Sequence, residues 1–163
     1  MPEFHNSATL PHPPFPGSHI VMDEDYVHLS GLTAADIQGS EAVLGDVGEE
    51  TRWIMRRLAH LLESAGCGLE DVVRVMVHMT DLDEAEAMDA AYVDFFTPPN
   101  FPARTCTESP RLLGGAHVEI TLTARRPAKD KAPREQGEKQ EEDAERQATS
   151  DRRSDDDQGE NGD

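Results

Sequence analysis

The chain has 163 residues, enough for one domain with a substantial core and too few for two domains of typical size. Its 33 Asp and Glu residues outnumber the 15 Lys and Arg residues, giving a formal net charge of −18. Such a charge repels phosphate backbones and anionic membranes, which argues against binding to either. It favours adaptation to a salt-rich cytoplasm, and the alternative is an ordinary acidic protein with an acidic tail.

The N-terminal part predicts an arm followed by a hairpin. Residues 1–14 contain four prolines and little apolar periodicity, so we expect a loose arm or an expression-derived leader. The short apolar runs 19–22 and 26–29 are separated by three acidic residues, which is typical of two strands joined by a solvent-facing turn. Ser30-Gly31 ends the second strand.

The middle of the chain predicts a helix, a strand and a second helix. Apolar residues recur at intervals of three and four over 46–65, with Asp46 as the expected N-cap and Gly66 as the stop. Residues 69–80 alternate in the manner of a strand with one buried face, expected to carry Val73, Val75, Val77 and Met79. Helical periodicity returns over 82–96, where it is ended by a Thr-Pro-Pro segment.

Two further strands are predicted at 101–108 and 118–124. In the second, Val118 and every other residue after it are apolar, while Glu119 begins the polar face. We expect these strands to pair, which would bring Arg104 and Glu119 close together. An Arg fork binds a carboxylate, and an ionised Glu orients or deprotonates a water, so the pair indicates a small anionic substrate and hydrolysis. The alternative is a structural salt bridge.

This order of elements predicts an α+β fold in which two helices cover one face of a mixed sheet. The uncovered face would expose an apolar patch, so we expect a second copy of the chain to cover it. After residue 127 apolar residues nearly vanish, which is typical of disorder. We therefore predict an arm at 1–14, a folded domain at 15–127 and a disordered, solvating acidic tail at 128–163. Residues 1–127 have 20 acidic and 8 basic residues, a charge of −12, and all three Lys lie in the tail.

Metal and disulfide chemistry are not expected. The two cysteines, Cys67 and Cys106, form no CxxC motif, and the seven histidines lack the spacing of metal ligands. The N-terminus does not have the regions of a signal peptide, and no apolar run approaches ~18 residues. We expect a soluble cytoplasmic protein.

Five segments follow one another in the chain: Ser30-Gly31, residues 62–73, residues 89–92, residues 102–106 and Val118-Glu119-Ile120. Together these segments resemble the RidA (YjgF-type) family of reactive-intermediate deaminases, which act on enamines and imines. The resemblance covers residues 15–127. It implies a chorismate-mutase-like fold, a homotrimer with its site between subunits, and no cofactor.

The resemblance also implies roles for four residues. Arg104 would bind the substrate carboxylate, and Glu119 would position the attacking water as the catalytic residue. Cys106 matches a position whose main-chain carbonyl helps to hold the site, although its thiol alone would indicate packing. Ser30 is a candidate donor to the substrate, with turn formation as the alternative.

This chain departs from the family at three places. Gly17 stands where the family has a substrate-contacting Tyr, which predicts a larger or more open pocket. Asp89 replaces a usual Asn, and Glu50 replaces a frequent Gln. Substrate preference is therefore less constrained by the resemblance than reaction type.

Three functions follow from these observations. The first is hydrolysis of 2-enamine or 2-imino acids to 2-keto acids and ammonia. The second is a non-catalytic trimer that binds a small carboxylate and regulates a partner, which the missing Tyr favours. The third, a ribonuclease or translation-inhibitor role claimed for some family members, fits poorly with a charge of −18 because phosphate contacts need a basic surface.

Overall fold

The computed structural model describes residues 1–13 and 15–127. Residues 1–127 form one compact unit. The tail predicted to be disordered, 128–163, lies outside the described residues.

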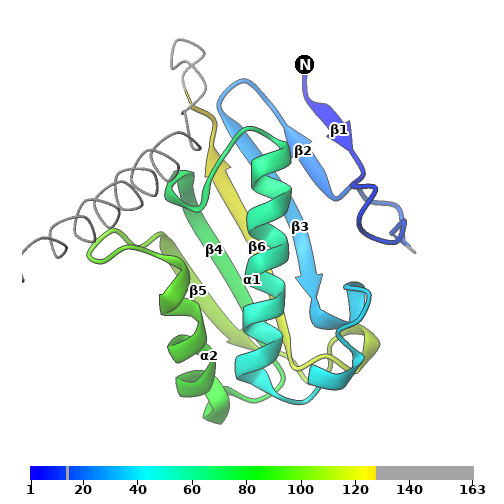
Figure 1. Cartoon of the computed structure of the whole chain (residues 1–163), viewed down its shortest axis with the longest axis vertical. Coiled ribbons are helices and arrows are strands. Elements are labelled where there is room, and N and C mark those ends of the chain that lie inside the picture. The colour runs from blue at the N-terminus through cyan, green and yellow to red at the C-terminus, as the bar shows by residue number, and fades with distance from the viewer. Residues whose placement is uncertain (14, 128–163) are drawn as a thin grey trace, which may run out of the picture. The chain divides into compact units, whose positions relative to one another are not determined.

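A mixed six-stranded sheet in the order β1-β2-β3-β6-β4-β5 forms the centre of this unit (Figure 1). Only β4 and β5 run parallel, and the other neighbours are antiparallel. Because β4 lies between β5 and β6, the predicted pairing of the last two strands is wrong. The strands are β1 Glu3–His5, β2 Ile20–Met22, β3 Tyr26–Thr33, β4 Val72–Met79, β5 Ala103–Glu108 and β6 Val118–Arg125.

Two helices, α1 Val47–Ser64 and α2 Ala85–Tyr92, cover one face of the sheet, as predicted (Figure 1). The Asp46 side chain accepts a hydrogen bond from the Glu49 backbone at 3.0 Å, which confirms the predicted N-cap of α1. Gly66 follows α1 with a φ of 75°, a left-handed conformation that favours glycine. Single 3₁₀ turns occupy Ala34–Asp36, Glu41–Val43, Leu69–Asp71, Leu82–Glu84, Val93–Phe95 and Leu113–Gly115.

The core lies between the helices and the sheet. The predicted apolar face of β6 is confirmed, because its four apolar residues are all at most 1% exposed. On β4 the prediction is wrong at Val73, which is 42% exposed, whereas Val72 is buried. The register between β4 and β6 shifts between Val72 and Arg74, so the alternation of the faces is interrupted there.

The N-terminal segment differs from the predicted loose arm. Residues Glu3–His5 form β1, which pairs antiparallel with β2 at one edge of the sheet. The Ser7 backbone N–H also donates to His19 Nδ1 at 3.0 Å. The sequence does not indicate β1, because an edge strand three residues long needs no apolar face of its own and therefore shows no apolar periodicity.

The face of the sheet away from the helices is polar, which corrects the expected apolar patch. Six of its residues are Thr or His and few are apolar. Neighbouring strands contribute His28, His78, Thr105, Thr107, Thr121 and Thr123 to this open face. Such a polar face does not by itself require a second copy of the chain to cover it.

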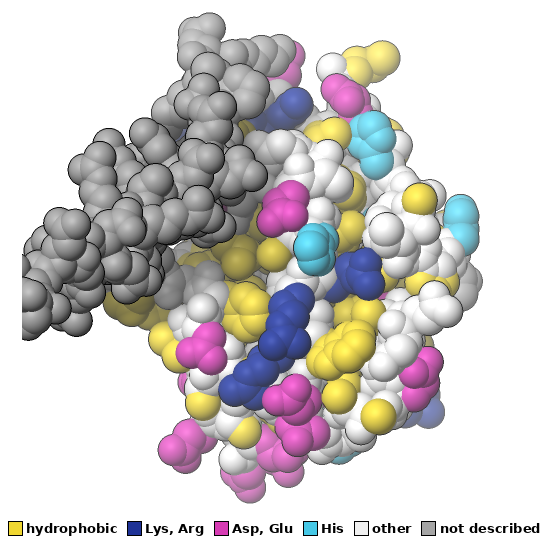
Figure 2. All heavy atoms as spheres, in the orientation of Figure 1, with side chains coloured by type: hydrophobic (Ala, Val, Ile, Leu, Met, Phe, Trp, Pro, Cys, Tyr) yellow, Lys and Arg dark blue, Asp and Glu magenta, His cyan; other side chains and the backbone are white. Residues whose placement is uncertain are grey.

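The helix-covered face has an uneven charge distribution. Figure 2 shows basic side chains gathered along the middle of this face and acidic side chains at its lower end. Helix α1 supplies three of the arginines, Arg52, Arg56 and Arg57. No helix among the described residues is long and apolar enough to cross a membrane.

Candidate functional site

Arg104 belongs to a cluster on the helix-covered side of β5. It pairs with the buried Val75 of β4, and parallel partners share a face. Its Nη1 donates to the Asp89 carboxylate on α2 at 2.5 Å. This hydrogen bond raises the pKa of Arg104 above its already high value, so the guanidinium stays charged. We call Asp89, Tyr92, Arg104 and Cys106 the Arg104 cluster.

Aromatic rings close one side of the Arg104 cluster. The Arg104 guanidinium carbon lies 5.0 Å from the centre of the Tyr92 ring, within the range of a cation–π contact. Tyr92 contacts Phe96 at 4.9 Å between ring centres, and Phe96 contacts Phe101 at 6.4 Å. The Tyr92 hydroxyl is buried without a hydrogen-bond partner in the described structure, and burial raises the pKa of Tyr92 to about 12.

Cys106 lies two residues beyond Arg104 on the same side of β5, opposite the buried Val77. Burial raises the pKa of its thiol, which disfavours the reactive thiolate. Strand β5 is an edge of the sheet, with a neighbour only on the β4 side among the described strands. Its other side therefore has backbone groups available to a ligand or another chain.

Glu119 belongs to a different cluster, on the open face. It lies on β6 opposite His78 of β4 and Thr33 of β3. The register of β3 shifts at Ser30-Gly31, where two residues face Thr121 alone. A Cβ added at Gly31 would overlap a carboxylate oxygen of Glu119, so the carboxylate rests directly on this glycine.

Ser30 lies in the same shift of register but its hydroxyl is already engaged. The Oγ donates to the Ser18 carbonyl at 2.6 Å, which ties β3 to the segment before β2. The proton that a substrate donor would offer is therefore used within the chain. Ser30 Oγ remains available as an acceptor.

The region of the missing Tyr is partly filled. A Cβ at Gly17 would lie 2.8 Å from the Phe15 ring, so that ring covers the glycine. Phe15, Ser30 and Gly31 line a hollow of about 50 Å³, room for a few waters.

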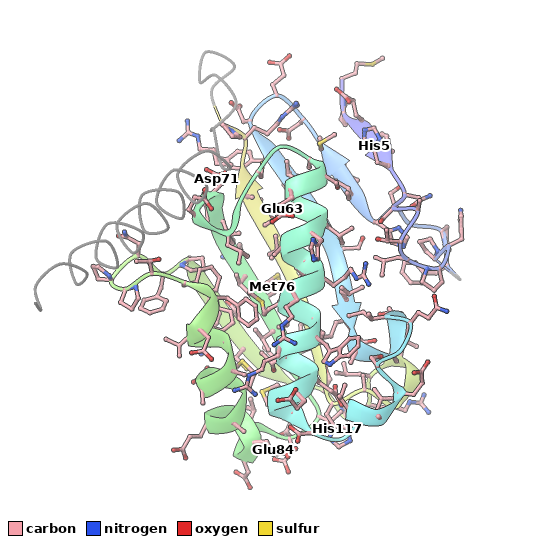
Figure 3. The ribbon with its side chains drawn as sticks, viewed as in Figure 1. His5, Glu63, Asp71, Met76, Glu84 and His117 are labelled. Atoms are coloured by element: carbon pink, nitrogen blue, oxygen red, sulfur yellow. The ribbon has the colours of Figure 1, made fainter. Side chains whose placement is uncertain are left out.

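Glu50 anchors the start of β6 and so helps to position Glu119. Its carboxylate is fully buried in α1 and accepts backbone hydrogen bonds from Gly45 at 2.7 Å, His117 at 2.9 Å and Val118 at 3.1 Å. Figure 3 shows His117 near Glu84 at the lower end of the helices, and their side chains lie 3.8 Å apart. The carboxylate thus satisfies all three of these backbone N–H groups, whereas the His117 side-chain Nδ1 is buried without a hydrogen-bond partner in the described structure.

One chain does not bring Arg104 and Glu119 together. They lie on opposite faces of the sheet, and β4 separates their strands. On β4 Arg104 pairs with Val75 and Glu119 pairs with His78, three residues further along. Three residues along a strand and two spacings between strands put the Cα atoms of Arg104 and Glu119 roughly 14 Å apart. No single small substrate spans that separation around a sheet. Residues 1–13 and 15–127 also bring no three potential His, Cys, Asp or Glu ligands together for a metal.

Sequence reasoning missed three contributors to these clusters. In the sequence Gly31 stands out only as part of the Ser30-Gly31 motif, because its contact with Glu119 depends on cross-strand register. His78 faces Glu119 across the strands and forms a hydrogen bond with Thr107 at 2.6 Å, which also depends on register. Asp89 stands out in the sequence only as a departure from the family pattern, because its ion pair with Arg104 joins a helix to a strand.

Comparison with known proteins identifies the family. The sequence matches the endoribonuclease L-PSP family over residues 9–126, most of the chain. The chain belongs to this family, the RidA (YjgF) family. The resemblance seen in the sequence is thereby confirmed.

Individual relatives of this RidA-family chain have low sequence identity to it, but their alignments cover most of both chains. It is 29% identical over 124 residues to a RutC family protein of Pyrococcus horikoshii, covering 76% of this chain and 98% of the relative. It is 28% identical over 109 residues to human 2-iminobutanoate/2-iminopropanoate deaminase, covering 67% and 79%. The crystal structure of the YjgF gene product of Escherichia coli is 27% identical, with a TM-score of 0.69 and coverage of 77% and 99%. The mixed α+β fold is thus shared with the family.

Proposed function

We propose that this protein hydrolyses 2-imino acids, formed from 2-enamines, to 2-keto acids and ammonia. Support comes from the family and from the relatives named as deaminases, together with a charged Arg104 and a Glu119 held in a defined place. Water would attack C2 of the imine, and its proton would pass through the Glu119 carboxylate to the nitrogen. The hydroxyl proton of the resulting intermediate is then transferred to the nitrogen, the C–N bond breaks with its electron pair leaving on ammonia, and the C–O bond becomes the C=O of the ketone. No cofactor is needed for this balance.

The observation that carries the proposal is the separation of Arg104 and Glu119 on opposite faces. A site that uses both requires Arg104 from one chain and Glu119 from another. The family resemblance implies three subunits, so we propose a homotrimer with each site between two subunits, in which the open face with Glu119 meets the edge strand β5 of a neighbour. Closed cyclic symmetry repeats that single contact around the ring.

In this site Arg104 anchors the substrate carboxylate through guanidinium donors that Asp89 does not use. The backbone at Cys106, on the edge strand, supplies a further contact. Ser30 contacts the substrate as an acceptor, since its proton goes to Ser18. The Phe15 ring takes part of the place of the family Tyr, beside Gly17.

The second candidate is a non-catalytic trimer that binds a small carboxylate and regulates a partner. The ion pair between Arg104 and Asp89 favours this binding role, because one of the Arg104 N–H donors that would bind a substrate anion is already used by Asp89. A ribonuclease role, which the family name carries, fits poorly with a charge of −18.

The first experiment compares single variants on 2-aminoacrylate generated in situ. Arg104→Ala should lose both keto-acid binding and hydrolysis, and Glu119→Gln should keep binding while losing most hydrolysis. Losses of about 30-fold or more are expected where a buried or partly buried charged contact disappears. Arg111→Ala and Glu63→Gln, exposed changes of the same charge, are the controls. Equal activity in all variants rejects the enzyme, and binding without any hydrolysis favours the regulator.

The second experiment tests whether two chains build one site. Chains carrying Arg104→Ala and chains carrying Glu119→Gln are co-expressed with different tags, and mixed assemblies are isolated. In every mixed trimer one of the three sites combines the intact Arg104 of one chain with the intact Glu119 of the other. Activity should return to about one third of the wild-type level. Mixed assemblies as inactive as the parents would refute the shared site.

A further inference from the structure

We propose that Asp89 makes the site selective for ligands that carry a positive charge next to the carboxylate. The preferred class is the 2-iminium or 2-ammonium carboxylates, and 2-keto acids bind more weakly. This inference rests on the proposed function, in which Arg104 receives the ligand carboxylate.

The geometry places a fixed negative charge beside the anion-binding group. Asp89 accepts from Arg104 at 2.5 Å, and the two side chains are 50% and 29% exposed, so both are open to a ligand. The bond uses one of the five guanidinium N–H groups, and the others have no partner within the described chain. The second Asp89 carboxylate oxygen is likewise without a hydrogen bond to another described residue.

Arg104 has a second contact on its other side, which favours its position beside Asp89. Its guanidinium lies over the Tyr92 ring, at 5.0 Å, and Tyr92 is itself buried. In this position a ligand carboxylate shares Arg104 with Asp89. It takes the remaining donors while the Asp89 charge stays within a few ångströms.

The positive charge of Arg104 and the negative charge of Asp89 nearly cancel, and together they discriminate between ligands by the charge on C2. A keto acid brings only a negative charge, which Arg104 attracts and Asp89 repels. A ligand with a protonated nitrogen on C2 brings both signs on neighbouring carbons, and its N–H group can donate to the free oxygen of Asp89. An uncharged Asn in the same place would remove both the repulsion and the added attraction.

This selectivity separates substrate from product in the proposed reaction. The protonated imine satisfies Arg104 and Asp89 together. Hydrolysis replaces its nitrogen with a ketone oxygen, which cannot donate to Asp89 and leaves the carboxylate opposed by a like charge. The site therefore binds the keto acid product more weakly than the imine substrate, which favours product release.

The test measures binding of two stable probes to the full-length protein by calorimetry. The probes are 2-aminobutanoate and 2-ketobutanoate, which differ only at C2. The wild type should prefer 2-aminobutanoate. In Asp89→Asn, 2-ketobutanoate should bind about three- to tenfold more tightly and 2-aminobutanoate more weakly, a range set by the partial exposure of the carboxylate. The preference should shrink in 1 M KCl, where charges are screened within about 3 Å.

Asp94→Asn is the matched control, because Asp94 is an exposed carboxylate shortly after α2. It should leave both affinities unchanged. An unchanged ratio of affinities in Asp89→Asn, or a wild type that prefers the keto acid, overturns the inference. No binding of either probe to the wild type rejects the inference together with the proposed site. Selective binding that Asp89→Asn abolishes, in a protein without hydrolytic activity, supports the inference and rejects the enzyme.

Discussion

Replacing Glu50 with Gln should destabilise the fold although the two side chains have nearly the same shape. The Glu50 carboxylate is fully buried and accepts three backbone hydrogen bonds, one on one oxygen and two on the other. Gln offers one accepting oxygen. Whichever way the amide turns, its NH₂ group faces at least one N–H donor, so at least one backbone N–H and the new NH₂ group lose their partners.

The expected cost follows from these lost partners. A buried polar group without a partner costs about 1–3 kcal/mol, and the remaining bonds lose the strengthening that a charged acceptor gives. We expect the free energy of unfolding to fall by about 2–5 kcal/mol. That is a large part of the roughly 5–15 kcal/mol that keeps a typical domain folded. Because His117 and Val118 precede Glu119, hydrolytic activity should fall as well.

Denaturant unfolding at one fixed protein concentration measures this change, since association would shift the midpoint. Glu63→Gln is the control, because it removes the same charge from the same helix at a side chain that is 67% exposed. It should change stability by less than about 0.5 kcal/mol. If Glu50→Gln is as stable as Glu63→Gln, the reasoning on the buried acceptor is refuted.

Three further predictions concern the open-face site, the aromatic wall and the surface charge. Gly31→Ala should fold normally but lose most activity, because the added Cβ displaces the Glu119 carboxylate; wild-type turnover in a folded variant contradicts this. The pKa of Tyr92 is about 12 against an ordinary 10.0, so the folded chain holds this proton more tightly and stability should fall as pH rises from 10 to 12. Tyr92→Phe should remove that slope and the corresponding ultraviolet transition in a chain with two tyrosines, and a transition that persists refutes the assignment. The melting temperature should rise from low to molar KCl, since residues 1–127 carry 20 acidic and 8 basic residues; a fall would reject adaptation to salt.

The sequence alone determined most of the local structure. Helix α1 was readable because an N-cap, a period of 3.6 and a terminal glycine all depend on neighbours within a few residues. Strand β6 was readable because strict alternation marks one buried face, which also places Glu119 on the face away from the core. The matching segments in order were enough to identify the family.

Only the tertiary structure decided how the site residues relate in space. The sequence of β5 has no apolar alternation, so nothing in it tells which face Arg104 occupies; its contacts with Asp89 and Tyr92 settle that. The insertion of β4 between β5 and β6 is a choice among strand partners far apart in the chain, to which local periodicity is blind. The contact of Gly31 with Glu119 and the three donors around Glu50 depend in the same way on register between distant segments. Residue type and spacing fix the chemistry that a side chain can perform, but its partners are set by the pairing of strands and the packing of helices.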